Sequence, residues 1–307
     1  MIKRVVAYGC SHAWGSEMSG RFNDTGNREF VFGNLVAKHY GVPFHRVAQP
    51  GNSNEGMLHQ VIEHCEEGDL SIFSGTQLRR SVYHPMSGND PIGPQTISQY
   101  EAGVICAENN AKLPWWLAIK NINQMKDVFA KQEVKHKLLE HRNDPHVPTM
   151  AEYFIGYRWE FLPLFIDYLK FYASWNAIAY SRGSYPVNFI SFESRTKLRN
   201  MLNLEKVAGS ISSHVGKGPH FRNAREDQYY TNERMPHTLN TSKHYLDWLN
   251  DPTRICKGDI CLLGWVLQQQ GLDPDKFPDN RMGHVGKEQQ PLIADEIIKR
   301  CEELGYE

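Results

Sequence analysis

The stretch Val5-Val6-Ala7-Tyr8-Gly9-Cys10-Ser11-His12-Ala13-Trp14-Gly15 decides the fold of this chain. Its first residues form a short apolar run, typical of the first buried strand of an α/β sheet, and its second half places a serine between glycines. Open α/β folds bind their ligands at the carboxyl ends of their strands. Ser11 is therefore either a nucleophile at this edge or a residue of the turn that follows the strand.

Strand and helix patterns alternate through the first quarter of the chain. Helical spacing ends at Gly41, and a second helix, with N-caps among residues 52–54, is expected to end at Gly68. Units of this length imply right-handed crossovers and a parallel sheet with helices on both faces. We therefore predict an α/β fold that begins with strands at residues 5–8, 44–48 and 70–73 and helices at 30–40 and 55–65.

The middle of the chain departs from this alternation. Residues 80–114 are polar and rich in Gly, Pro and Asn, which predicts a long loop over the strand ends. Residues 152–181 are rich in aromatic side chains at helical spacing, with Pro163 marking a start or a kink, and this spacing favours a core helix over a sugar-binding platform. We predict one domain over residues 1–307 with an insertion at about 80–183, and further elements at 115–141, 185–192, 241–249, 260–270 and 292–298.

Composition excludes several classes of protein. Lys and Arg number 34 and Asp and Glu number 35, so no basic field indicates a nucleic-acid partner. No apolar run approaches the roughly 20 residues needed to span a bilayer, and no signal peptide precedes the first strand. The six cysteines lack the spacing of a zinc site. These observations predict a cytoplasmic protein with free thiols, no membrane partner and no metal.

Candidate chemistry lies in the loops after the first three predicted strands, which meet at one edge of a parallel sheet. A serine hydroxyl is a weak nucleophile until a base removes its proton, and the oxyanion that forms needs fixed donors. Ser11 offers the hydroxyl, Gly51 offers an accessible backbone N–H, and Asn54 and Gln77 offer side-chain amides. His284, just before the last predicted helix, is the best-placed base in the sequence.

These residues fall in four blocks that resemble those of the SGNH/GDSL hydrolase family. Residues 9–15 are similar to the nucleophile block G-D-S-x-x-x-G, with Cys10 in place of Asp. Residues 48–54 resemble the glycine block, in a form with a trailing S-N associated with phage-encoded members. Gln77 stands at the asparagine of the third block, G-x-N, and residues 283–286 are similar to the closing block, where a D-x-x-H histidine precedes the final helix.

The resemblance implies a flavodoxin-like three-layer α/β/α sandwich with a central parallel sheet. It does not cover the middle of the chain, where composition predicts the helical aromatic-rich insertion. It also implies hydrolysis of a small acyl ester, such as an acetyl ester on a carbohydrate, without cofactor or metal. Ser11 would attack the carbonyl and His284 would act as base and then as acid. The oxyanion would bind the Ser11 and Gly51 N–H groups together with the amide of Asn54 or Gln77.

The sequence departs from the family pattern near its end. Arg281 stands three residues before His284, where the family has Asp, and the nearest upstream carboxylate is Asp279, which we expect to orient the His284 ring. One alternative is a binding or virion-associated module of the same fold with a degraded His-Asp pair. Another is a flavodoxin-like domain that binds a phosphorylated ligand, although no glycine-rich phosphate loop surrounds Ser11.

Overall fold

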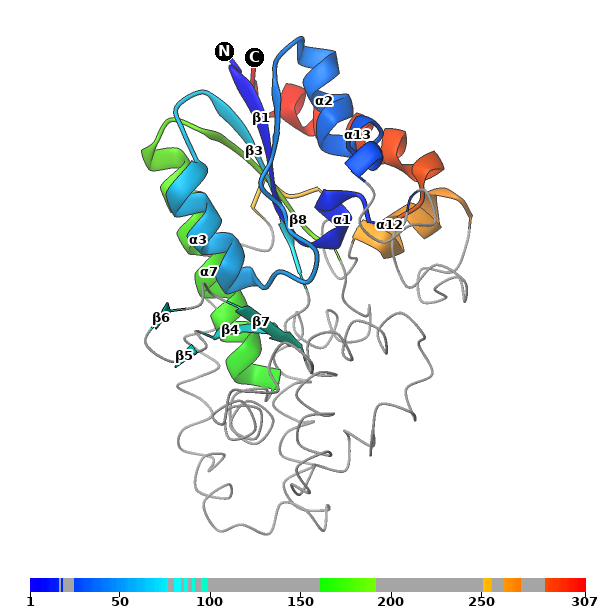
Figure 1. Ribbon diagram of the computed structural model, residues 1–307. Coiled ribbons are helices and arrows are strands. Elements are labelled where there is room, and N and C mark those ends of the chain that lie inside the picture. The colour runs from blue at the N-terminus through cyan, green and yellow to red at the C-terminus, as the bar shows by residue number, and fades with distance from the viewer. Residues whose placement is uncertain are drawn as a thin grey trace, which may run out of the picture.

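A four-stranded parallel sheet forms the centre of the molecule (Figure 1). Its strand order is β2-β1-β3-β8, with β1 at Arg4–Gly9, β2 at Phe44–Arg46, β3 at Asp69–Gly75 and β8 at Tyr185–Ile190. The predicted α/β class with a parallel sheet is confirmed. The computed structural model describes residues 1–16, 18, 25–76, 80–83, 86–87, 90–91, 95–98, 161–191, 251–255, 262–271 and 285–307.

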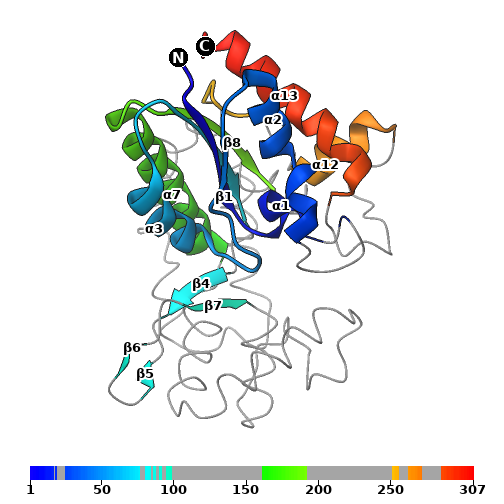
Figure 2. The same cartoon turned by 45° about the horizontal axis from the view of Figure 1, so that its top comes forward.

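Helices cover both faces of the sheet (Figure 2). On one face α2 (Phe32–Tyr40) packs against α13 (Gln290–Glu303), and on the other α3 (Asn54–His64) packs against α7 (Phe161–Ser181). This arrangement follows from the parallel pairing, because each return to the same edge of the sheet needs a crossover segment. The shorter helix α12 spans Leu262–Gln269, close to its predicted place.

Two predicted helix ends have different outcomes. Gly41 ends α2 with φ 67°, a left-handed conformation that glycine adopts without strain, as predicted. The prediction that Gly68 ends the next helix is wrong, because α3 ends at His64 and Cys65 continues with extended backbone. Gly68, at φ 82°, instead forms the turn that leads into β3.

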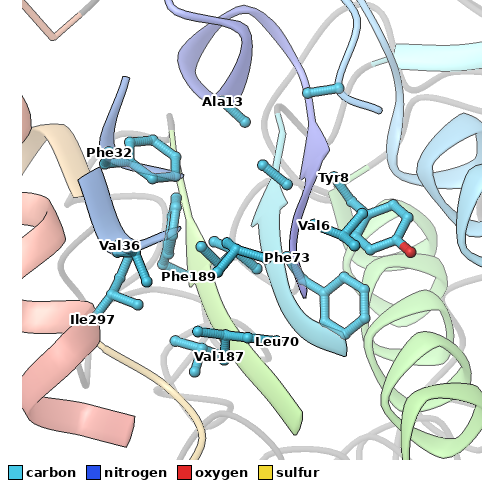
Figure 3. Close-up of a cluster of buried hydrophobic side chains, with 14 of the residues drawn as sticks. Val6, Tyr8, Ala13, Phe32, Val36, Leu70, Phe73, Val187, Phe189 and Ile297 are labelled. Carbon is cyan, nitrogen blue, oxygen red and sulfur yellow. The ribbon is translucent and has the colours of Figure 1, made fainter. Parts of the chain in front are cut away.

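The core lies on both faces of the sheet (Figure 3). Phe32 of α2 meets Phe189 of β8 edge to face at 5.6 Å, while Tyr8 of β1 lies 5.3 Å from Phe73 of β3, toward α7. All seven residues of β3 are buried. Strands covered on both faces are rich in apolar residues, and the apolar residues of β1 and β3 made these strands recognisable in the sequence.

The aromatic residues of α7 belong to the core, as predicted. Tyr168, Tyr172 and Trp175 are almost fully buried, and their rings pack against one another and against Phe73. Pro163 lies in the first turn of α7, where its missing N–H is tolerated, so it marks a start. Residues 161–181 of the predicted insertion therefore form a crossover helix on the sheet between β3 and β8.

A buried polar cluster fixes β8 to its neighbours. The side chain of Asn188, fully buried in β8, accepts the indole N–H of Trp175 at 2.8 Å and donates to Asn176 and to Thr253, each at 2.8 Å. Asn188 also forms a parallel backbone bridge with Arg254. Residues 251–255 thus lie beside β8 and add a single parallel bridge to that edge of the sheet.

The predicted loop at 80–114 contains short antiparallel pairs, which the polar composition did not reveal. β4 (Arg80–Tyr83) pairs with β7 (Gln95–Ser98), and β5 (Met86–Ser87) pairs with β6 (Asp90–Pro91). The helices predicted at 115–141 and 241–249 lie outside the described residues.

Cys10, Cys65 and Cys301 carry free thiols. Over the part of the chain that the structure describes, no helix combines the length and hydropathy needed to cross a membrane.

Candidate active site

Ser11 begins the single helical turn α1 (Ser11–Trp14) directly after the central strand β1. Its side chain is buried, with 5% of the residue exposed. The Ser11 carbonyl accepts the N–H groups of Gly15 and Ser16, both at 3.0 Å, and Gly15 ends the turn with φ 84°. Ser11 therefore lies in a rigidly bonded turn at the carboxyl edge of the sheet.

Gly9 lets the chain turn sharply from β1 into α1. Its φ is 139°, and a Cβ added at this position would lie 2.5 Å from the carbonyl oxygen of Ser74 in β3. Contacts this short do not occur between a real Cβ and a backbone oxygen, so the end of β1 approaches β3 as closely as it does only because position 9 has no side chain.

The loop after β2 is tied to this same point. The Gln49 N–H donates to the Gly9 carbonyl at 3.1 Å, and the Asn52 side chain donates to it at 3.3 Å. Gly51 lies between them with φ 76°. No hydrogen bond of its backbone N–H occurs among the described residues, so this N–H remains a donor for a ligand.

Asn54 connects the second loop to the third. Its Oδ1 accepts the Thr76 N–H at 2.9 Å and its Nδ2 donates to the Thr76 carbonyl at 3.3 Å. Ser53, and not Asn54, caps α3 by accepting the Gly56 N–H at 2.9 Å. An amide nitrogen carries two protons, so the Asn54 side chain has a second N–H beyond the Thr76 contact.

Three of the predicted site residues, Gln77, Asp279 and His284, lie outside the described residues. The described chain resumes at Val285, which is buried in the core. Gln290 fixes this segment, because its Oε1 accepts the Phe32 N–H at 2.9 Å while its Nε2 donates to the Val285 carbonyl at 3.4 Å. The residue next to His284 is thereby attached to the start of α2.

The structure also places residues at this edge that sequence reasoning missed. Tyr168 lies against Gly75 at the end of β3, and burial raises the pKa of its phenol, which therefore stays protonated. Arg46, the last residue of β2, stacks on Trp14 of α1 with 3.7 Å between its guanidinium carbon and the ring centre. A charged residue within the predicted strand 44–48 was the available signal for Arg46.

Together these contacts bring three loops to one edge of the sheet. Acyl transfer needs a hydroxyl and fixed N–H donors, and Ser11, the Gly51 N–H and the Asn54 amide lie on these loops. Among the residues described, no three His, Cys, Asp or Glu side chains gather as metal ligands would. Comparisons with protein-family models, with curated proteins and with solved structures return no match.

Proposed function

We propose that this chain is a serine esterase of the SGNH/GDSL type that hydrolyses a small acyl ester, such as an acetyl ester on a carbohydrate. The observation that carries the proposal is the position of Ser11. It follows the central strand in a fixed turn, and hydrogen bonds through Gly9 and Thr76 tie the Gly51 and Asn54 loops to the same edge.

The reaction uses the hydroxyl and the donors in sequence. Ser11 Oγ attacks the ester carbonyl while its proton passes to His284, and the oxyanion accepts hydrogen bonds from the Ser11 and Gly51 N–H groups and from the amide of Asn54 or Gln77. The alcohol leaves with the proton from His284. Water then attacks the acyl-Ser11 ester, releasing the acid and restoring the hydroxyl. Asp279 orients the His284 ring.

The strand order supports a flavodoxin-like three-layer sandwich for the whole domain. The order β2-β1-β3-β8, continued by the Asn188–Arg254 bridge, is the doubly wound order 2-1-3-4-5 of that fold. In such sheets the ligand site lies where the connections diverge to opposite faces, next to the end of β1. Ser11 occupies this position. The chain between β3 and α7 is then the insertion, and we propose that it recognises the alcohol part of the substrate.

Activity-based labelling tests the nucleophile. A fluorophosphonate probe should label the wild-type chain on the peptide that contains Ser11, and p-nitrophenyl acetate should be hydrolysed. Ser11→Ala should lose both, whereas Ser16→Ala, at a buried serine five residues further on, should retain both. Absence of labelling in the wild-type chain, or equal labelling of Ser11→Ala, contradicts the esterase proposal and favours a binding module of the same fold.

The His-Asp pair is tested separately. His284→Ala should remove most of the activity, because no other group is proposed to take the Ser11 proton. Asp279→Asn should lower activity by an intermediate amount, since the histidine would keep its place but lose its orienting carboxylate. An unchanged rate in Asp279→Asn would mean that Ser11 and His284 work without this carboxylate.

A further inference from the structure

We propose that Arg46 and Arg28 form a binding site for an anionic group of the substrate, next to Ser11. The inference rests on the proposed esterase function for its location, but the anion site itself is argued from its own contacts. It assigns the substrate to a chemical class: an acyl ester that carries a carboxylate, phosphate or sulfate.

Arg46 is held at the carboxyl edge by Trp14. Its Nη1 donates to the Trp14 carbonyl at 2.7 Å and its guanidinium plane lies over the indole ring, 3.7 Å from the ring centre. This stacking holds the guanidinium in place, and among the described residues only its Nη1 donates a hydrogen bond. Trp14 is the last residue of α1 and Ser11 the first, so about 4.5 Å of helix axis separates them.

Arg28 brings a second guanidinium to the same place. Its Nη2 donates to the Phe44 carbonyl at 2.8 Å, two residues before Arg46 on β2. Burial, and after it the positive charge of Arg28, lower the pKa of Arg46 from its usual value, as expected for a cation beside another cation. Arg28 is exposed and Arg46 is half-buried, so a ligand can reach both.

No carboxylate of the described residues balances this pair. Arg4, by contrast, is neutralised by Asp69 at 2.8 Å, and no ion pair of the described residues includes Arg28 or Arg46. The indole N–H of Trp14 is also buried without an acceptor in the described part of the chain. Two neighbouring cations that pair with no carboxylate of the described residues favour the binding of an anion.

The donor chemistry defines the ligand. A guanidinium presents parallel N–H groups that match two oxygens of a carboxylate, phosphate or sulfate. Because the pair lies one helical turn from Ser11, the anion cannot be the reacting carbonyl itself. It is a separate group of the same molecule, and its binding holds the ester over Ser11.

Paired substrates test this specificity. 4-Acetoxybenzoate has a carboxylate where 4-acetoxybenzamide has a neutral amide of similar shape, and we expect the wild-type chain to have the lower KM for the benzoate. Arg46→Gln and Arg28→Gln should each raise the KM for the benzoate about tenfold, and should raise the KM for the benzamide much less. Arg46→Lys should raise the KM for the benzoate by an intermediate amount, because lysine keeps the charge but lacks the parallel N–H groups of the guanidinium. Lys38→Gln removes an exposed charge on α2 and should change neither substrate.

Direct binding separates this proposal from the esterase proposal. Calorimetric titration with inorganic phosphate and with benzoate at low ionic strength should show binding to the wild-type chain and to Lys38→Gln, but not to Arg46→Gln. That result supports the anion site even when no ester is hydrolysed. Hydrolysis of both esters with equal KM and no anion binding overturns the anion site alone, and a chain that neither hydrolyses nor binds overturns both proposals.

Discussion

Asn54 and Thr76 form a two-point pair in which the Asn54 amide accepts the Thr76 N–H at 2.9 Å and donates to the Thr76 carbonyl at 3.3 Å. Asn54 begins α3 and Thr76 immediately follows β3, so one side chain holds two of the three loops at the carboxyl edge. Both residues are almost fully buried. A single side-chain amide therefore links the loop after β2 to the loop after β3.

Loss of this amide should therefore affect both stability and activity. Asn54→Ala leaves the buried Thr76 N–H without its acceptor, which should lower the free energy of unfolding by about 1–3 kcal/mol. It should also lower the rate of p-nitrophenyl acetate hydrolysis at least about tenfold, since the two loops are no longer held in register. Urea denaturation and steady-state kinetics measure the two effects.

The matched control for this prediction is Ser53→Ala. It removes the N-cap of the same helix, which should lower the free energy of unfolding by about 1 kcal/mol. The Asn54–Thr76 pair stays intact, so activity should be retained. Equal loss of activity in both variants would mean that α3 stability, and not the pair, controls the site.

Gly9→Ala should be among the most disruptive single substitutions in the described part of the chain. The added Cβ would lie 2.5 Å from the Ser74 carbonyl oxygen at a φ of 139°, so β1 must move away from β3. We expect a loss of about 3 kcal/mol in unfolding free energy from overpacking and backbone strain. Thermal denaturation followed by circular dichroism measures it.

Gly41→Ala provides the comparison. Gly41 also has a positive φ, 67°, but its added Cβ meets nothing within 4 Å. Alanine at position 41 should therefore lower the free energy of unfolding by roughly 1–2 kcal/mol, the cost of the left-handed conformation alone. A Gly9→Ala variant no less stable than Gly41→Ala would show that the approach of β1 to Ser74 is not restrictive.

The polar cluster around Asn188 should be worth more to stability than a surface amide. Asn188→Ala leaves the indole N–H of Trp175 and the hydroxyl of Thr253 without their partner in the core, for a loss of about 3 kcal/mol. Asn34→Ala removes an exposed contact with the Glu29 carbonyl and should change stability by less than about 0.5 kcal/mol. Urea denaturation followed by tryptophan fluorescence distinguishes them, and similar losses would contradict the role of the cluster.

Alkaline pH should destabilise the chain partly through Cys301. Burial raises the pKa of this thiol to about 12 from an unperturbed 9.0, so between these values the unfolded chain releases a proton that the folded chain keeps. This contribution to stability is present below pH 9 and is lost as the pH rises. By pH 10 about 1.4 kcal/mol of this contribution is lost.

The test compares the wild-type chain with Cys301→Ala by urea denaturation at pH 8 and pH 10. The cavity in the variant lowers its free energy of unfolding by the same amount at both pH values. This loss therefore cancels when the change from pH 8 to pH 10 is compared between the two proteins. The wild-type chain should lose about 1.4 kcal/mol more than the variant over this interval. Parallel losses in the two proteins would show that the thiol ionises equally in both states.

The sequence was sufficient to predict the α/β class because the deciding elements are determined locally. The central strands contain short apolar runs such as Val5-Val6-Ala7 in β1, and Gly41 ends α2 through its own backbone preference. The β4–β7 pairing was missed because its strands are short and polar, without the alternation that a half-buried strand shows. The predicted end of the helix at residue 65 lies one residue from the end of α3, but the role predicted for Gly68 was wrong, because Gly68 forms the turn before β3.

For the candidate site, the sequence predicted only the edge of the sheet on which it lies, and not the contacts between its side chains. Parallel topology alone brings the loops of Ser11, Gly51 and Asn54 to one end of the sheet. The pairing of Asn54 with Thr76 and the stacking of Arg46 on Trp14 depend on strand register and on side-chain direction. No local pattern encodes such contacts between residues that are distant in the sequence.

The pairing of β3 with β8 has a consequence for folding order and for divergence. Ser71 and Ser184 share a hydrogen bond across these strands although 113 residues separate them. Such long-range pairing slows folding, so β8 should join a sheet of β1, β2 and β3 that has already formed. The equilibrium penalty for a longer connection is small, about 0.6 kcal/mol for each doubling of its length. This connection can therefore lengthen or shorten during evolution while the loops around Ser11 keep their geometry.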